Sequence, residues 1–343
     1  MRKVNILLMI AALVIAATVS SAAADDAGNV RSDSQISASG TPTFATFDVP
    51  GAAGVPGAAV TIPMKFAYAR GYEYGIVGTY ADDTSRLHGF WSGPPVRTID
   101  FTELGTNTIV TAGDFDSSKF GYEEHFWGGQ DTDGTSCLNP GTGVCRAFVY
   151  RSNFSDAKGY ELFEIRYPNS LSTMVFSSRN WCCGIYTFVG AYASQDGTVH
   201  GWQFVVPLGY RTIDPPDAVF SFATDTNFNA SAVVGRWDTP DGATHGYLKI
   251  GDNYTTIDVP GAISTVAWGL APAGALYPQT IVGEYTDSDG VVHGFRTPDG
   301  GLTFEPIDFP NAIATRCRGV SGNRVLGSYI DSEGVEHGFI ATF

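Results

Sequence analysis

The sequence predicts an all-β fold built from six copies of one four-stranded antiparallel unit. A His-Gly-aromatic step recurs along the chain, and a degenerate version, Arg146-Ala147-Phe148, fills one further position. The intact steps are His88-Gly89-Phe90, His200-Gly201-Trp202, His245-Gly246-Tyr247, His293-Gly294-Phe295 and His337-Gly338-Phe339. From His88 to His337 there are 249 residues in five steps of about 50, a period typical of propeller blades. The pattern therefore predicts a six-bladed β-propeller.

Each repeat contains four short segments rich in β-branched and aromatic residues, separated by tight turns. In the best-preserved copy, residues 263–310, these segments are 264–268, 280–286, 291–296 and 302–309. Asp/Gly turns between such segments are a strong hairpin signal. A four-stranded sheet cannot bury both of its faces alone, so we expect the copies to pack around one axis.

A second signature, an acidic residue followed closely by proline, marks the fourth strand. It occurs at Asp48, Asp214, Asp258 and Asp308, and in weaker form at Asp100 and Glu164. The chain begins its repeats with such an element (residues 43–50) and ends with a third strand that lacks a fourth. We therefore expect residues 43–49 to pair with the C-terminal strand and close the ring, which removes an exposed sheet edge.

Glycines mark the second strand of five repeats. They stand at Gly78, Gly190, Gly235, Gly283 and Gly327, each after a branched aliphatic residue. Glycine inside a strand indicates a bulge or a close approach of another backbone.

The N-terminal region predicts export. Residues 1–24 combine Arg2 and Lys3, an apolar run and a small-residue cleavage site, as secretory signals do. Residues 25–42 are predicted to be a flexible leader, and residues 43–343 a single domain. Removal of the signal leaves 18 basic against 35 acidic residues. So acidic a surface argues against nucleic acid and anionic membranes as partners. The sequence contains no second apolar run, so no membrane span is predicted.

The five cysteines suit an oxidising compartment. Cys137 and Cys145 bracket a long hairpin loop, and a disulfide between them is predicted. Cys182 and Cys183 are adjacent, so a bridge between them would be strained, and their redox state stays open. Cys317 is expected to be an unpaired buried thiol.

Most histidines and acidic turns are interpreted as structural. Five of six histidines occupy the repeated position, which favours hydrogen bonds that hold each repeat together over catalysis. Acidic turns such as Asp287 with Asp289 fit hairpin chemistry better than metal binding. Asp114 and Asp116 remain a weak calcium candidate, the only cofactor considered.

A ligand site is expected at a mouth of the central channel, lined by first strands and their loops. The candidate ligand-binding residues are Arg70, Arg179, Trp181, Asp225, Trp268, Arg316 and Arg318. The alternative is that these side chains simply fill the channel. If the protein is an enzyme, the first catalytic candidates are Asp114, Asp116, Glu123, Glu124 and His125. His125 is the one histidine outside the repeated position.

Two resemblances support this interpretation. Residues 297–304, Thr-Pro-Asp-Gly-Gly-Leu-Thr-Phe, resemble the Asp-box turn of sialidase-type propellers, a structural turn in those proteins. The combination of Ile-Asp-x-Pro-Gly-Ala, Val-Gly-x-Tyr, Asp-x-x-Gly and His-Gly-Phe resembles the HAF-repeat proteins, which are extracellular bacterial proteins. It covers residues 43–343, is strongest in the last three repeats and is weakest in the second. The resemblance implies a secreted or periplasmic bacterial protein and transfers no reaction.

Three functions remain open from the sequence. The first is a secreted, non-enzymatic binding or scaffold module whose partner is an extracellular polysaccharide or protein. The second is a carbohydrate-active enzyme that uses two carboxylates at the channel mouth. The third is a calcium-stabilised structural surface protein.

Overall fold

The computed structural model describes residues 40–50, 61–69, 72–93, 96–100, 107–118, 121–131, 145–153, 160–180, 186–271 and 280–343. Every regular element in these ranges is a β-strand, so the predicted all-β class is confirmed. None of the described residues forms a helix of the length and apolarity needed to cross a membrane.

Strand pairing divides the described strands into six antiparallel groups of four, numbered here as repeats one to six. The first three comprise β2 (Ile62–Ala69), β3 (Tyr72–Ala81), β4 (Leu87–Trp91) and β5 (Arg97–Ile99); β6 (Asn107–Ser118), β7 (Gly121–Asp131), β8 (Arg146–Asn153) and β9 (Tyr160–Ile165); and β10 (Ser172–Asn180), β11 (Tyr186–Ala193), β12 (Val199–Val205) and β13 (Gly209–Ile213). The last three comprise β14 (Phe220–Thr226), β15 (Ala232–Asp238), β16 (Thr244–Ile250) and β17 (Asn253–Ile257); β18 (Ser264–Leu270), β19 (Ile281–Thr286), β20 (Val292–Thr297) and β21 (Glu305–Ile307); and β22 (Ala314–Ser321), β23 (Arg324–Ile330), β24 (Glu336–Thr342) and β1 (Thr43–Phe47).

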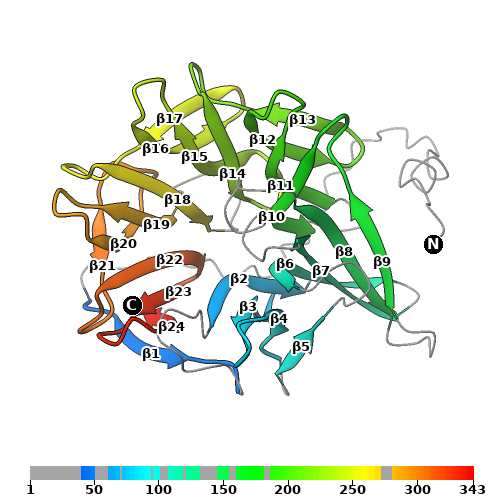
Figure 1. Cartoon of the computed structure of the whole chain (residues 1–343), viewed down its shortest axis with the longest axis horizontal. Helices are drawn as coiled ribbons and strands as arrows, with labels where there is room; N and C mark the ends of the chain where they lie inside the picture. The colour runs from blue at the N-terminus through cyan, green and yellow to red at the C-terminus, as the bar shows by residue number, and fades with distance from the viewer. Residues whose placement is uncertain are drawn as a thin grey trace, which may run out of the picture. The chain divides into compact units, whose positions relative to one another are not determined.

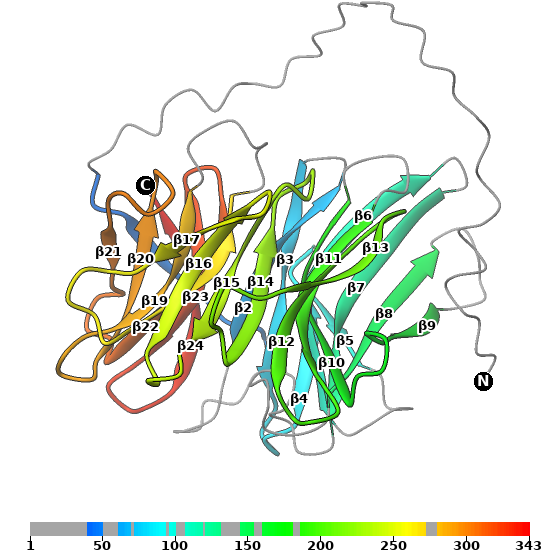
Figure 2. The same ribbon diagram turned by 90° about the horizontal axis from the view of Figure 1, so that it is seen from above.

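The first strands of the repeats lie innermost and contact one another in cyclic order: β2, β6, β10, β14, β18, β22 and again β2 (Figure 1). In the view turned by 90°, the strand axes of the repeats are roughly aligned with one another (Figure 2). Short parallel pairings connect neighbours at Thr244 with Ser264 and at Tyr68 with Asp114, but among the described strands no sheet closes on itself. The repeats therefore meet mainly through side chains.

Each first strand carries a β-bulge opposite a second-strand glycine. The bulged residues are Met64, Thr111, Phe176, Thr224, Trp268 and Arg318. A Cβ on the facing glycine would overlap a first-strand carbonyl oxygen, at Gly78, Gly128, Gly190, Gly235, Gly283 and Gly327. The predicted close backbone approach is confirmed at the five expected positions, and Gly128 adds the sixth, which the sequence pattern missed.

The aromatic residue of each His-Gly-aromatic step pairs across the strands with that glycine. These side chains are Phe90, Phe148, Trp202, Tyr247, Phe295 and Phe339, and all are less than 2 % exposed. Because the glycine has no side chain, the ring can lie over its backbone and fill the space between repeats.

The repeated histidines form hydrogen bonds within their repeats, as predicted. In five repeats the Nδ1–H donates to the fourth-strand aspartate, over 2.8–3.1 Å, giving five His–Asp pairs. These are His88–Asp100, His200–Asp214, His245–Asp258, His293–Asp308 and His337–Asp48. Each ring also lies against a second-strand Tyr or Trp, at 5.1–5.3 Å between centroids.

The acidic turns act as turn residues. In Asp287, Oδ1 accepts the backbone N–H groups of Asp289 and Val291, and Oδ2 accepts from Nε2 of His293. Asp299 of the Asp-box-like segment likewise accepts backbone N–H groups, from Leu302 and Thr303. Turn chemistry thus accounts for these carboxylates.

Repeat six joins the two ends of the domain. Strand β1 pairs antiparallel with β24, from Thr43 opposite Thr342 to Phe47 opposite Gly338. This confirms the predicted pairing of residues 43–49 with the C-terminal strand. The His337–Asp48 pair adds a bond across the same junction, at 2.9 Å.

Repeat two departs from the pattern, and its register corrects one prediction. Ile165 pairs with Ala147 just as Ile213 pairs with Gly201 in repeat three. The residue after Ile165, Arg166, therefore occupies the aspartate position, and the expectation that Glu164 fills it was wrong. Repeat two thus has Arg146 in the histidine position and Arg166 in the aspartate position.

Replacing Asp48 by Asn should loosen β1 more than the same change at Asp258 loosens β17. Both substitutions weaken one His–Asp pair, worth about 1 kcal/mol. Strand β17 stays joined to β16 by a short turn, whereas β1 meets β24 only through strand pairing. Amide hydrogen exchange should therefore accelerate in residues 43–47 of D48N well beyond that in residues 253–257 of D258N. Equal acceleration would contradict this role of Asp48.

Candidate functional site

A buried ion network closes the centre of the six first strands. The Lys65 ammonium lies 3.2 Å from the Asp225 carboxylate and donates to the carbonyl oxygens of Trp268 and Arg318. Asp225 also accepts from Arg179, at 3.0 and 3.1 Å, and from the Ser177 hydroxyl at 2.6 Å. Lys65, Ser177, Arg179 and Asp225 are together called the central ion network below.

The network fits because the position after the bulge is small in the other repeats. Lys65 and Asp225 both follow a bulged residue, and the equivalent residues are Ala112, Ser177, Gly269 and Gly319. One long cation and one anion can therefore meet across the centre. With side chains 3 % and 1 % exposed, they are paired and hydrogen-bonded, as buried charges must be.

Burial shapes the protonation of both groups. It lowers the pKa of Lys65 to about 8, although Asp225 raises it. Burial alone would raise the pKa of Asp225, but Arg179 and Lys65 outweigh it, so this pKa lies below its ordinary value. Arg179 and Asp225, predicted as ligand-binding residues, are thus engaged with each other and fill the channel.

A cavity of roughly 590 Å³ lies on the axis beside this network, within the usual size range of ligand pockets. Its described walls come from every repeat except the second: Ile62, Met64, Phe176, Phe220, Phe222, Arg236, Asp238, Val266, Trp268, Glu284, Arg316, Arg318, Ile330 and Glu336. This space is called the central cavity below. Three predicted ligand-binding residues, Trp268, Arg316 and Arg318, come together in it.

The charged side chains of the central cavity balance one another. Arg236 pairs with Asp238 at 2.9 Å. Arg316 lies 3.5 Å from Glu284 and 3.8 Å from Glu336, and Arg318 lies 3.8 Å from Glu284. The described wall therefore carries three cations and three anions.

These charges break the repeat. Two residues before the bulge, repeat six has Arg316, where the other repeats have Ile62, Ile109, Met174, Phe222 and Val266. One residue after the second-strand glycine, repeat five has Glu284, where repeat three has Ala191. Sequence reasoning missed Glu284, Glu336 and Arg236, although comparing residues at matched distances from each glycine would have found Glu284 and Arg236.

Three buried polar atoms on this wall have no hydrogen-bond partner among the described residues: Trp268 Nε1, Arg318 Nε and Glu284 Oε2. The Arg318 guanidinium lies over the Trp268 ring, at 4.1 Å from its centroid. Buried polar atoms normally find partners. Glu284 Oε2 has ion-pair partners in Arg316 and Arg318, so the unmet capacity of this wall lies in the two donors.

The remaining predicted site residues are only partly described. Arg70 and Trp181 lie outside the described residues. Strand register places Asp114 opposite His125, Asp116 opposite Glu123, and Glu124 opposite Phe115, but the side chains of the five acid–base candidates are not described. Among the residues that are, no cluster of three or more His, Cys, Asp or Glu side chains could hold a metal ion. Calcium binding at Asp114 and Asp116 stays a prediction.

The cysteines are placed in part. Cys317 is a buried free thiol, as predicted, and burial raises its pKa well above the ordinary value. Cys145 is buried in a hydrophobic cluster. Cys137, Cys182 and Cys183 lie outside the described residues, so the Cys137–Cys145 disulfide stays a prediction.

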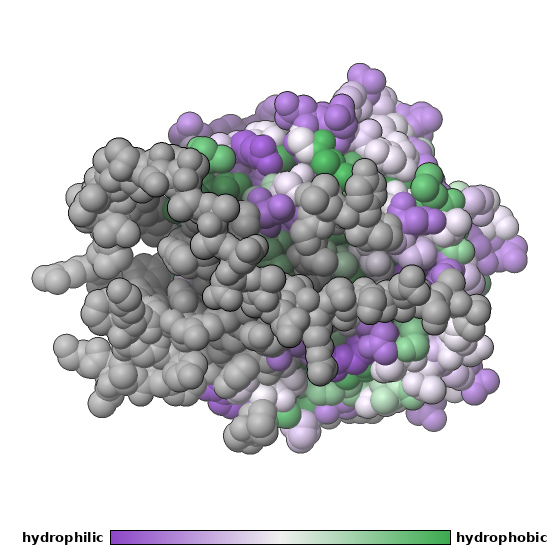
Figure 3. Space-filling model, turned by 180° about the vertical axis from the view of Figure 1, so that it is seen from behind, coloured by the Kyte–Doolittle hydropathy of each residue, from purple (hydrophilic) through white to green (hydrophobic). Residues whose placement is uncertain are grey.

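On the face drawn in Figure 3, hydrophobic residues form separate areas between hydrophilic ones. Exposed aliphatic residues such as Leu208 and Leu302 are ordinary on protein surfaces when scattered.

Comparison with known proteins supports the fold. No family model and no curated protein sequence matches the chain. Among solved structures, the Hadza microbial sialidase Hz136 is 12 % identical, with a TM-score of 0.50 over 83 % of this chain and 66 % of its own. The sialidase of Trypanosoma rangeli is 8 % identical (TM-score 0.49, 89 % and 59 % covered), and the lectin of Aleuria aurantia is 9 % identical (0.48, 83 % and 93 %).

This chain spans less than two thirds of the length of either sialidase. The likeness to the first sialidase shows a β-propeller fold and carries no information on activity.

The central ion network should make stability depend on pH in alkaline solution. Folded Lys65 loses its proton near pH 8, whereas an unfolded lysine keeps it to 10.5. Between these values the unfolded state binds more protons, so this group makes the free energy of unfolding rise with pH. The free energy of unfolding, measured with urea, should therefore rise from pH 8 to about 10 in the wild-type protein relative to Lys65→Met. A difference independent of pH would contradict the assignment.

Proposed function

We propose that this chain is a secreted, six-bladed β-propeller that binds a neutral carbohydrate in the central cavity without hydrolysing it. The six blades are the six repeats, and the ring closes where β1 pairs with β24. The cyclic contacts of the six first strands support this count. The signal-like N-terminus and the HAF-repeat motifs support secretion from a bacterial cell.

The polar groups of the cavity wall carry the proposal. The guanidinium groups of Arg316 and Arg318 can donate, and the carboxylates of Glu284 and Glu336 can accept. A hydroxyl group does both, so a ring with several hydroxyls can bond to donors and acceptors alike. A sulfate group only accepts, so it offers no donor to the two carboxylates.

The remaining walls agree with a sugar. The described wall has equal numbers of cations and anions, so it offers no excess charge to an anionic ligand. Apolar side chains, among them Met64, Phe176 and Ile330, complete the cavity.

One observation favours a second function, glycoside hydrolysis. Glu284 and Glu336 both depart from the repeat and both lie within 4 Å of the Arg316 guanidinium. Glycosidases use two carboxylates on either side of the scissile bond. In this reading Glu284 and Glu336 replace the residues of β6 and β7 as the first catalytic candidates.

Replacing Glu284 by Gln should weaken binding of neutral oligosaccharides. The amide keeps the shape of the side chain but loses a charged acceptor, which corresponds to about a tenfold rise in Kd. Glu305→Gln is the matched control, because Glu305 pairs with Arg296 outside the cavity. Binding is measured by calorimetry, after a screen of neutral oligosaccharides has identified a ligand.

The length of the oligosaccharide after incubation separates the two functions. An intact ligand that binds more weakly to E284Q supports the binding protein. A ligand shortened by the wild type but not by E284Q or E336Q would establish the hydrolase. Equal binding by E284Q and the wild type would remove the central cavity from consideration.

A further inference from the structure

Repeat two replaces a bonded pair by two like charges. In the other five repeats the histidine and aspartate positions hold a His–Asp pair with a bond of 2.8–3.1 Å. In repeat two Arg146 and Arg166 stand at these positions. Two guanidinium groups are always charged and have no acceptor, so they cannot bond to each other.

A second feature confirms this alignment. The backbone N–H after Arg166, that of Tyr167, donates to Thr173 Oγ1 at 3.0 Å. In repeat four the N–H after Asp258, that of Val259, donates to Thr265 Oγ1 of the next repeat at 3.1 Å. The geometry around Arg166 is thus that of an aspartate position, with only the side chain changed.

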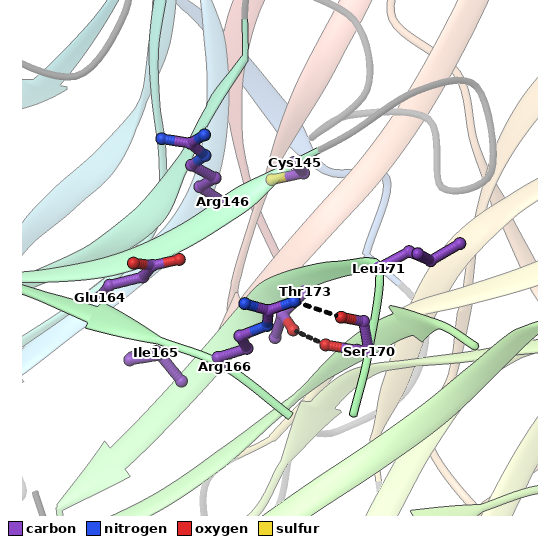
Figure 4. Close-up of a pocket in the computed structure, with 8 residues that line it drawn as sticks. All are labelled: Cys145, Arg146, Glu164, Ile165, Arg166, Ser170, Leu171 and Thr173. Carbon is purple, nitrogen blue, oxygen red and sulfur yellow. Dashed lines mark hydrogen bonds between the residues drawn. The ribbon is translucent and has the colours of Figure 1, made fainter. Parts of the chain in front are cut away.

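A surface cavity of roughly 300 Å³ has opened at this position (Figure 4). It is lined by Cys145, Arg146, Glu164, Ile165, Arg166, Ser170, Leu171 and Thr173. Arg166 donates one hydrogen bond, to the carbonyl oxygen of Ser170 at 2.8 Å. Among the described residues, neither Arg146 nor Arg166 has an ion-pair partner, and Glu164, also exposed, leaves the lining with one net positive charge.

We propose that this cavity binds a small oxyanion, the carboxylate or sulfate group of a singly charged ligand, between Arg146 and Arg166. The planar guanidinium matches two oxygens of such a group, and an anion between the two arginines restores the opposite-charge pairing that the His–Asp pair supplies elsewhere. The acidic surface disfavours long polyanions, so the ligand carries few charges. This site is independent of the central cavity and of its proposed ligand.

Restoring the repeat provides the test. In the double variant R146H/R166D, repeat two acquires the pair found in the other five repeats. Binding of glucuronate and of methyl sulfate is measured by calorimetry at low ionic strength, with thermal unfolding in parallel. We expect the double variant to bind at least about tenfold more weakly than the wild type and to unfold at a higher temperature in the absence of ligand.

Single substitutions keep the test decisive if the double variant does not fold. Arg146→Ala and Arg166→Ala should each weaken oxyanion binding, whereas Arg211→Ala should not, because Arg211 is bonded to Gln203 outside the cavity. Tighter binding of glucuronate assigns the site to carboxylates, and tighter binding of methyl sulfate assigns it to sulfate groups. Absence of binding to the wild type, or an equal loss in R211A, would overturn the proposal. Binding of neutral oligosaccharides should be the same in R146H/R166D and the wild type.

Discussion

Each repeat depends on one glycine in its second strand, because two neighbours occupy the space of a side chain there. One is a carbonyl oxygen of the bulged first strand, and the other, in every repeat but the second, is the aromatic ring of the third strand. At Gly235, for example, a Cβ would overlap both the Phe222 carbonyl and the Tyr247 ring. The glycine therefore fixes the bulge, and the bulge determines which first-strand side chains meet at the axis.

The bulge also separates the axis into two layers with different chemistry. At and before the bulge, large residues such as Phe176 and Trp268 line the central cavity. One residue later, four small side chains leave space that Lys65 and Asp225 fill. Removing either partner would leave a buried charge without its counter-ion and destabilise the fold, so this layer has a structural role. Ligand chemistry is left to the layer before it.

The sequence predicted what recurs locally and missed what depends on strand register. The His-Gly-aromatic steps, the five second-strand glycines and the pairing of β1 with β24 could be read because each repeats at a fixed spacing. Lys65 and Asp225 are 160 residues apart and resemble nothing else in the chain, so no pattern joins them. Glu164 was assigned to the aspartate position because it is the acidic residue nearest to that point of the repeat. The strand register instead places Arg166, the residue after Ile165, at this position.

The same repetition explains why departures carry information. Five His–Asp pairs hold their repeats with bonds worth about 1 kcal/mol each, and the contacts between neighbouring first strands remain when one pair is absent. Repeat two can therefore exchange its pair for Arg146 and Arg166 at small cost to the fold. Arg316 likewise replaces an apolar residue without disturbing the glycine that fixes its strand. Positions that the fold does not need to repeat are thus where this chain can acquire binding chemistry of its own.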